Sequence, residues 1–455
     1  MSRSNPSTAK ATGARPASEE SAPQTETPRA ATADPISQLA PPQDAGTPGA
    51  ASGTGSERRV RISSPQNLLA AVPWLLRFQP GRSIVVIGTE PSGGTVIVTL
   101  RYDLPDPGRP RMARALARQA VSLLNAHGIT NAVLVGYGTD AEVSPVTAAL
   151  RERAASNGIT VTEALRAENG RYWSYVCSDP ECRPPEGTPF DPDPRSASEL
   201  FAGITVLASR EALAATLGPV VGDNLAVMLK AVRAAKRDAR ALAKTTAGMR
   251  RREAKETVAG PGLQSVQEVI DQYRAGGSLD SRKEAAKLLV ALRSELRVRD
   301  DGWARMDPEH GDAHLRMWTD LTRLAPRGYV APPASLLAFV AWQLGDGALA
   351  NVALDRALAD APGYSMAELI REALDSGAPP SMARLPMTPE EVALAYGLAD
   401  EAAEAKEREE EARAEQDRAE AEGGAQERVG SDSDAKVPEG EAALTDSPVT
   451  GTSST

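Results

Sequence analysis

Residues 132–165 read AVLVGYGTDAEVSPVTAALRERAASNGITVTEAL, and this stretch decides the fold class. It opens with Ala132–Val135, a short apolar run that is typical of a strand buried on both faces. A helix is predicted to begin at Ser144-Pro145 and to end before Gly158, which suits a helix C-terminus. Ile159–Leu165 predicts a second strand. The order of strand, helix and strand indicates an α/β fold.

The preceding chain extends this pattern. Ser64-Pro65 offers a helix N-cap and first residue, and Pro73 is expected to kink or end that helix. Ser83–Gly88 and Thr95–Tyr102 are predicted to pair as a β-hairpin. Other predicted elements are a strand at Arg59–Ile62, a helix at Arg109–His127 and a strand at Arg171–Cys177. Together they predict a mixed sheet covered by helices over about residues 58–222.

Beyond Pro219 the predicted elements are all helices. Asn224 to about Val258 predicts one or two long helices, and Gly260-Pro261-Gly262 is expected to break the run. Further helices are predicted at Ser265–Tyr273, Ser281–Leu296, Asp307–Leu324, Pro333–Leu344, Ala348–Asp360 and Met366–Asp375. The sequence therefore predicts a basic helical connector at 223–262 and an all-α domain at 263–398.

The two ends of the 455-residue chain have a different composition. Residues 1–57 are mostly Ser, Thr, Pro, Ala, Gly and charged residues, with too little apolar surface to offset the entropy of ordering. Residues 399–455 form an acidic tail, whose first half can be transiently helical. Both tails are predicted to be disordered, which leaves roughly 340 residues for two folded domains.

Composition also narrows the class of protein. The net charge of −10 comes substantially from the acidic tail and argues against affinity of the whole protein for nucleic acid. The sequence lacks an apolar run long enough to span a membrane, and its N-terminus lacks the apolar segment of a signal peptide. The two cysteines suit a reducing compartment. The expected location is the cytoplasm, with no membrane contact.

One motif has the spacing of a dinucleotide site. Gly136-Tyr137-Gly138-Thr139-Asp140-Ala141 is formally G-x-G-x-x-A, and Glu163 lies on the next predicted strand. In a true site the helix begins inside the glycine motif, whereas Ser144 places the predicted start several residues later. A tight turn between strand and helix is the preferred interpretation, and no cofactor is predicted.

Asp307, His310, Asp312 and His314 form a candidate metal cluster. The two histidines are four residues apart and therefore share one face of a predicted helix. The alternative is structural, because Asp307 also suits a helix N-cap and Pro308 a first helical residue. Cys177 and Cys182 have ligand-like spacing but lack a second ligand pair nearby. A divalent metal thus remains an alternative to a site without cofactors.

Arg171, Tyr172, Trp173 and Tyr175 crowd a single predicted strand. One face of such a strand is expected to pack in the core, and the other can line a groove for a small ligand. Core packing is the default for aromatic residues on a strand. These four residues are the candidate ligand-binding set.

A basic segment follows the predicted sheet. Between Lys230 and Lys255 lie ten Lys or Arg residues and only two acids. This segment can contact nucleic acid or pair with the acidic tail of the same chain. It contains no aromatic residue for base stacking, so a solvated helix face is the default and nucleic acid is not the favoured partner.

Gln343–Pro362 resembles the second half of a tetratricopeptide repeat. Gly345-Asp346 suits the turn between two helices, and the small Ala350 and Ala357 let those helices approach closely. One unit cannot build a solenoid, and an ordinary helical hairpin explains the pattern equally well. The pattern suggests that the helical domain binds a protein partner.

Several separated motifs together resemble a known family. They are Ser64-Pro65 with Leu68–Pro73, Gly170–Tyr175, Cys177 with Pro184–Thr188, and Trp303, His314, Trp318 and Gly347–Ala350. The chain resembles an actinobacterial family defined only as a domain of unknown function, over about residues 58–382. This resemblance implies no activity, substrate or cofactor. Typical members have two adjacent cysteines where this chain has Cys182-Arg183, which counts against a metal at that loop.

The preferred hypothesis is a non-enzymatic regulatory or scaffolding protein that binds a partner through its helical domain. The sequence lacks a G-x-S-x-G or H-E-x-x-H motif, so it offers no recognisable catalytic machinery. One alternative is a metal-assisted hydrolase that uses His310 and His314. The other is a nucleic-acid accessory protein that uses the basic segment 230–255.

Overall fold

A computed structural model of the full chain describes residues 64–90, 95–177, 184–192, 205–383 and 387–430. Side chains near the end of the last range are described as far as Ala419. The strand predicted at Arg59–Ile62, the residues of both predicted tails outside these ranges, and Cys182 lie outside the described residues.

The first described element is α1 (Pro65–Leu76). The Ser64 Oγ accepts a hydrogen bond from the backbone N–H of Asn67 at 3.2 Å, and Pro65 is the first helical residue, which confirms the predicted start. The helix continues through Pro73, so the expected break there is wrong. Burial of Val72, Pro73 and their neighbours holds this turn against the sheet.

Six strands form one mixed sheet in the order β2-β1-β3-β4-β5-β6. They are β1 (Ser83–Thr89), β2 (Val96–Asp103), β3 (Asn131–Tyr137), β4 (Thr160–Glu168), β5 (Arg171–Ser174) and β6 (Thr188–Pro189). β3 and β4 are parallel, and the other neighbours are antiparallel. The predicted hairpin is β1–β2. A second hairpin joins β4 and β5 through Asn169-Gly170, whose positive φ values suit a two-residue turn.

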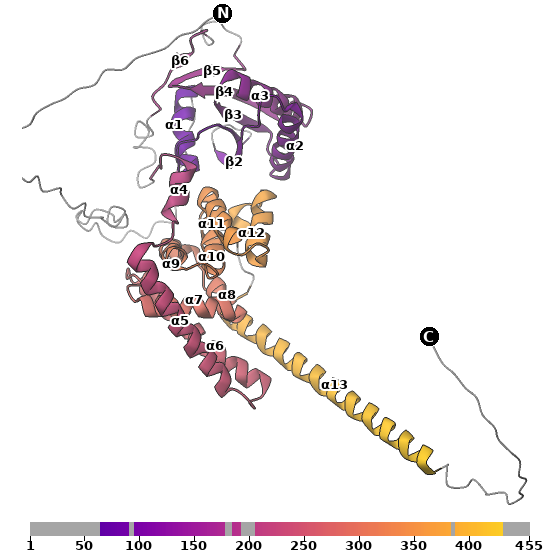
Figure 1. The fold of residues 1–455 in the computed structure, drawn as a ribbon. Coiled ribbons are helices and arrows are strands. Elements are labelled where there is room, and N and C mark those ends of the chain that lie inside the picture. The colour runs from indigo at the N-terminus through magenta and orange to yellow at the C-terminus, as the bar shows by residue number, and fades with distance from the viewer. Residues whose placement is uncertain (1–63, 91–94, 178–183, 193–204, 384–386, 431–455) are drawn as a thin grey trace, which may run out of the picture. The chain divides into compact units, whose positions relative to one another are not determined.

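Helices cover both faces of this sheet (Figure 1). Along β1, Val85 and Ile87 pack in the cluster that contains α1, whereas Ile84 and Val86 pack with α2 (Pro110–Ala126) and α3 (Asp140–Ala155). This alternation follows from the two-residue period of a strand. The predicted α/β class of the first region is confirmed.

The described chain after β6 is helical. Its elements are α4 (Arg210–Thr216), α5 (Gly222–Thr245), α6 (Arg251–Arg274), α7 (Arg282–Ser294), α8 (Leu296–Ala304), η4 (Pro308–His310), α9 (Gly311–Leu324), α10 (Ala331–Gln343), α11 (Gly347–Asp360), α12 (Ser365–Asp375), η5 (Pro380–Met382) and α13 (Pro389–Gly430). The predicted all-α region is confirmed. None of the described helices is long and apolar enough to span a membrane.

The break between the two long basic helices lies at residues 246–250, and not at Gly260-Pro261-Gly262 as predicted. These three residues lie inside α6. A Cβ atom at Gly262 would come within 2.8 Å of Val298 and 2.9 Å of Ala291, so the glycine allows α6 to pack closely on the neighbouring helices. Tertiary packing outweighs the poor helix propensity of this tripeptide.

The helical hairpin predicted from the repeat-like motif is α10–α11. Gly345 has a φ of 78° in the turn between the helices, and the Asp346 side chain caps α11 by accepting the N–H of Leu349 at 3.0 Å. Ala350 and Ala357 are fully buried, as their small size predicts. Residues 331–342 of α10 are buried on every side, which makes this hairpin the centre of the helical core.

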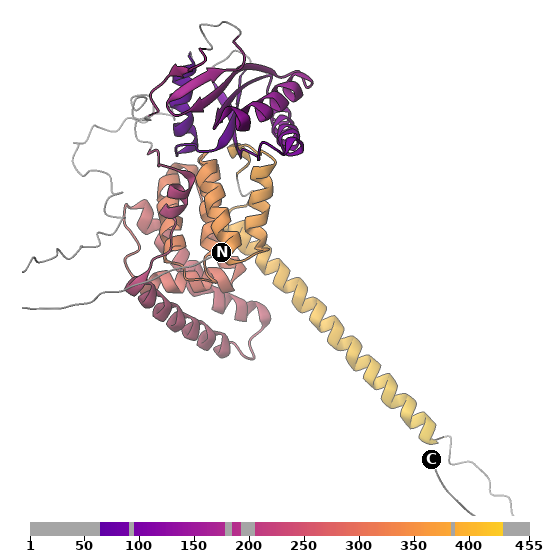
Figure 2. The same ribbon diagram turned by 45° about the horizontal axis from the view of Figure 1, so that its top comes forward.

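α13 extends further into the acidic C-terminal segment than the sequence predicts. The helix continues from Pro389 to Gly430, through residues predicted to be a tail. Val392 is buried, and the Tyr396 hydroxyl donates to Asp300 of α8 at 2.7 Å. Figure 2 shows α13 as a single yellow helix that continues beyond these contacts.

Candidate functional site

Six cations share one face of α5, which we call the basic face. At 3.6 residues per turn they fall within an arc of about 120° and span about 21 Å along the helix. Met228, Val232 and Ala235 lie outside this arc and are buried. All six cations are exposed, and none has an ion pair or hydrogen bond with a described residue: Lys230, Arg233, Lys236, Arg237, Arg240 and Lys244.

The spacing of the basic face is electrostatically unfavourable for an isolated helix. Arg233 and Arg237, and likewise Lys236 and Arg240, are four residues apart and repel one another. Solvated helix faces usually carry both acidic and basic side chains. The acidic residue of this stretch, Asp238, lies outside the arc of the six cations. The basic face thus carries a positive charge that an anionic partner would stabilise.

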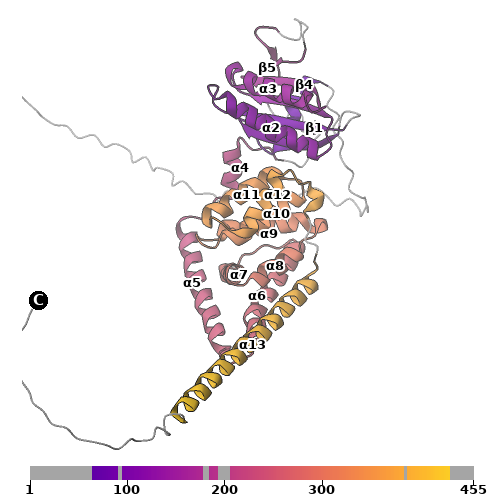
Figure 3. The same cartoon turned by 90° about the vertical axis from the view of Figure 1, so that its right-hand side faces the viewer.

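Three of the four remaining cations of the predicted basic segment are paired. Arg251, Arg252 and Lys255 of α6 pair with carboxylates of α13, which runs beside α6 and α8 (Figure 3). The pairing with the chain's own acidic segment that the sequence allows is therefore realised on α6. It is not realised at the described residues of α5, and the distinction between the two helices is invisible in the sequence alone.

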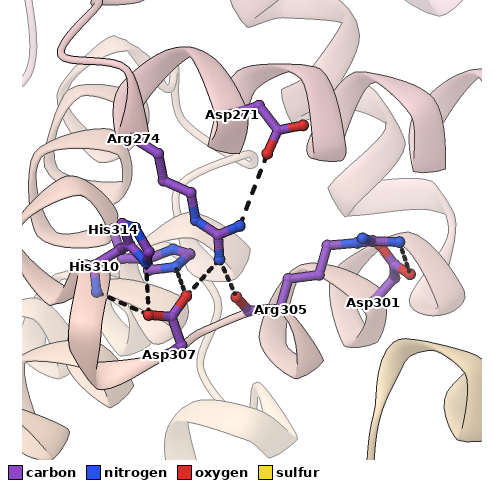
Figure 4. Close-up of polar contacts among 7 residues, drawn as sticks. All are labelled: Asp271, Arg274, Asp301, Arg305, Asp307, His310 and His314. Carbon is purple, nitrogen blue, oxygen red and sulfur yellow. Dashed lines mark hydrogen bonds and ion pairs between the residues drawn. The ribbon is translucent and has the colours of Figure 1, made fainter.

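The predicted metal cluster is organised around Asp307 (Figure 4). Its Oδ1 accepts the backbone N–H of His310 at 2.8 Å and lies 2.9 Å from the His310 Nδ1. Its Oδ2 lies 3.6 Å from the His314 Nε2 and also accepts a hydrogen bond from Arg274 of α6. Asp312 is exposed in the first turn of α9. The structure thus brings Asp307 and the two histidines together.

Arg274 changes the chemistry of this cluster. Burial favours the protonated carboxyl, but the hydrogen bonds from His310 and the charge of Arg274 outweigh it and lower the pKa of Asp307. The guanidinium already supplies the positive charge that a metal would bring. Among the described residues no group of three His, Cys, Asp or Glu side chains is arranged to hold a metal ion. The metal-assisted hydrolase stays a prediction, and this geometry favours the structural alternative.

His314 gives the protein a pH-dependent stability. Burial and the charge of Arg274 lower the pKa of His314 to about 4, although Asp307 opposes them. In the unfolded chain the pKa is about 6.5. The unfolded state therefore binds the proton first as pH falls, and the stability associated with the neutral ring is lost between about pH 6.5 and pH 4.

We expect a His314→Gln variant to lose about 2–3 kcal/mol less stability than the wild type between pH 7 and about pH 4.5. Urea unfolding of the full chain at a series of pH values measures this difference. Met317→Leu is the matched control, because Met317 is also buried on α9 but has no titratable group, so its replacement should leave the pH dependence unchanged. Parallel curves for the wild type and the His314 variant would contradict the assignment.

A second charged pair lies near the Asp307 cluster. Arg305 binds Asp301 through two contacts of 2.6 and 3.1 Å, and Asp301 is only 5 % exposed. Both residues line an open cavity of about 410 Å³ between α6, α8 and the start of α13. Because Arg305 neutralises Asp301, the buried carboxylate of this cavity is committed to structure and does not offer a free general base.

The aromatic strand β5 uses its polar atoms within the fold. The Tyr172 hydroxyl accepts from Gln66, and the Trp173 Nε1 donates to the carbonyl of Pro185. Arg171 donates to the carbonyl oxygens of Glu186 and Gly187. The Tyr175 hydroxyl donates to Asp140, and Arg166 stacks on the Trp173 ring with its guanidinium carbon 3.6 Å from the ring centre. The contacts of Arg171 and Trp173 fasten the 184–189 segment to the sheet. The predicted ligand groove stays a prediction.

The glycine motif differs from its prediction. α3 begins at Asp140 inside the motif, so the predicted start at Ser144 is wrong. The reason is local, because the Glu142 carboxylate accepts the Thr139 N–H at 3.0 Å and the Thr139 hydroxyl at 2.9 Å. Arg82 donates to the same carboxylate at 2.5 Å. The hydrogen bond from Arg82, with those from Thr139, lowers the pKa of Glu142 to about 2.

These contacts decide the chemistry of the turn. A helix N-terminus at a glycine turn is where a nucleotide phosphate usually binds. Here the ionised Glu142 occupies that position. Glu163, the predicted ribose-binding residue, instead accepts the Ser174 hydroxyl at 2.9 Å in the middle of the sheet. The arrangement supports the tight-turn interpretation. The structural reason is the Glu142 carboxylate at the helix N-terminus, whereas the reason from the sequence is a later start of the helix.

Comparison with known proteins identifies one family. A family model described as "Domain of unknown function (DUF4192)" matches residues 65–381, which is more than half of the chain. No curated protein and no solved structure matches the sequence.

Proposed function

The chain belongs to this family of unknown function, and from the geometry of α5 we propose that it is a nucleic-acid-binding protein whose basic face contacts the phosphate backbone of a duplex. The observation that carries the proposal is the line of six exposed cations without partners among the described residues. The proposal keeps the non-catalytic binding role expected from the sequence and changes the partner from protein to nucleic acid. It includes a cytoplasmic location.

The composition of the basic face favours phosphate over protein. Protein interfaces place apolar and aromatic side chains at their centre. Between Lys230 and Lys244 the arc holds cations and no aromatic side chain. Phosphate contacts need only charge and position, and they carry no sequence information. We therefore expect binding that is independent of base sequence and steeply dependent on salt.

The negative net charge of the chain does not prevent α5 from binding nucleic acid. The chain carries −10 overall, but carboxylates of α13 are held against α6, away from the six cations of α5. At physiological ionic strength exposed charges act over about 8 Å, so a local stripe of cations outweighs distant acids. The net charge of the whole sequence does not reveal this separation of acidic and basic side chains in the fold.

The test is the salt dependence of binding to a fluorescent duplex of about 20 base pairs, measured by anisotropy on the full chain. Each lost phosphate contact lowers the slope of log Kobs against log[salt] by about 0.9. Lys236→Gln, Arg237→Gln and Arg240→Gln together are expected to lower the magnitude of the slope by about 2.7.

The matched control removes three cations from another exposed helix face, through Arg111→Gln, Arg114→Gln and Arg118→Gln on α2. It should leave the slope unchanged. Equal effects of the two triple variants would mean that only net charge matters and would overturn the proposal. Binding of poly-glutamate at α5 without binding of the duplex would overturn it in favour of an acidic protein partner.

A further inference from the structure

The acidic helix α13 has three parts with different surroundings. Its root packs on α8 and α6, where Val392 is buried and the Tyr396 hydroxyl bonds to Asp300. Asp400 ends this part, and its carboxylate pairs with Lys255 while the residue is only 4 % exposed. The root is therefore a fixed attachment of α13 to the helical core.

The second part, residues 401–407, contacts the core through its carboxylates. Glu401 pairs with Arg252 at 2.5 Å, and Glu407 pairs with Arg251. Glu404 accepts the backbone N–H of Arg252 at 2.9 Å. No residue from 401 to 407 is buried. This contact segment is held by that hydrogen bond and by exposed ion pairs, which are individually weak and weakened further by salt.

The third part, from Arg408 to Glu415, makes no ion pair or hydrogen bond outside α13 with a described residue. Ion pairs along the helix, Glu404 with Arg408 and Lys406 with Glu410, support it as a single helix. The contact segment thus lies between a fixed root and an unattached part, residues 408–415.

The cations under the contact segment follow the basic face closely along the chain. Only residues 246–250 separate α5 from α6. The side chain of Arg250 in this link is exposed and has no ion pair or hydrogen bond with a described residue. Arg251 and Arg252 follow directly. The carboxylates of Glu401 and Glu407 therefore occupy the two cations by which the basic face would extend onto α6.

We propose that the 401–407 segment of α13 mimics a polyanion and competes with nucleic acid for Arg251 and Arg252, the cations that follow the basic face at the start of α6. This inference rests on the proposed function. Duplex bound at α5 reaches Arg251 and Arg252 only when the contact segment leaves them, so the segment limits both the size of the binding site and its affinity. The buried root keeps the released segment tethered, ready to return.

The variant Glu401→Gln, Glu404→Gln and Glu407→Gln tests the competition in the same anisotropy assay. It frees Arg251 and Arg252, so it should bind more tightly and raise the magnitude of the salt slope by about 1.8. The matched control, Glu409→Gln, Glu411→Gln and Glu415→Gln, removes the same charge from the unattached part and should leave the slope unchanged. Equal changes in both variants would overturn the competition.

A second set of variants distinguishes the loss of the ion pairs from the loss of negative charge. In a chain that carries Arg251→Gln and Arg252→Gln, the same 401–407 variant should leave the slope unchanged, because no cation remains to be freed. An undiminished increase there would overturn the inference.

Hydrogen exchange distinguishes a failure of this inference from a failure of the proposed function. Without nucleic acid, raising the salt concentration should bring the exchange rate of amides 401–407 to that of amides 409–415. If the amides respond to salt but no duplex binds, the proposed function fails. If duplex binds through α5 while amides 401–407 stay protected, the competition fails and the proposed function stands.

Discussion

Replacing Trp318 with alanine is expected to lower the free energy of unfolding by about 3–5 kcal/mol. Trp318 lies in the middle of α9 and is fully buried. A Cβ atom at Gly302 of α8 would be 3.4 Å from its ring, so the indole fills the space between two helices. Alanine would leave a cavity that these helices cannot close without moving. Urea unfolding of the full chain, followed by circular dichroism, measures the loss.

Trp318→Phe is the informative control. The Trp318 Nε1 has no hydrogen-bond partner among the described residues, so losing this N–H should carry no penalty of its own. Phenylalanine keeps most of the ring volume and is expected to cost less than half as much as alanine. Equal losses for the two variants would show that the indole N–H contributes to stability and that the cavity explanation is wrong.

An Asp360→Ala variant is expected to lose about 3 kcal/mol of stability. Asp360, at the end of α11, accepts the N–H groups of Gly328, Val330 and Ala331 at 2.7, 2.9 and 3.3 Å. These groups precede or begin α10, where no residue of the same helix can accept them. Removing the carboxylate leaves several donors unsatisfied in a partly buried site. Urea unfolding again measures the change.

Two comparisons make this prediction specific. Asp360→Asn keeps one oxygen acceptor and should lose roughly half as much stability as Asp360→Ala. Glu372→Ala removes an equal charge from an exposed position on α12 and should leave stability within about 0.5 kcal/mol of the wild type. A loss of similar size in the Glu372 variant would assign the effect to net charge and not to the hydrogen bonds of Asp360.

Local patterns in the sequence predict the elements whose causes are local. Ser64-Pro65 predicts the start of α1 because cap and first residue adjoin. The β-branched run of β1 and the alternation of β2 predict their hairpin. Gly260-Pro261-Gly262 fails as a helix break because Val298 and Ala291, which make room only for glycine there, come from other helices. The ordered contacts of α13 at residues 400–407 are missed for the same reason, since they are made with cations of α6.

The candidate sites divide in the same way. The sequence predicts that His310 and His314 share a helix face with Asp307 nearby, and the structure brings them together. It cannot predict Arg274, which approaches from α6 and supplies the competing cation. The sequence also counts the cations at 230–255 correctly. Only the fold separates those that α13 pairs from those that stay unpaired.

The carboxylate of Glu142 joins three elements at one end of the inner strands β1 and β3. They are Arg82 before β1, Thr139 after β3 and the first turn of α3. In nucleotide-binding folds this place is completed by a phosphate that must be acquired from solution. Here the anion is covalently part of the chain and is present as soon as the helix forms. The N-terminus of α3 therefore already has a negative charge beside it that belongs to the helix itself.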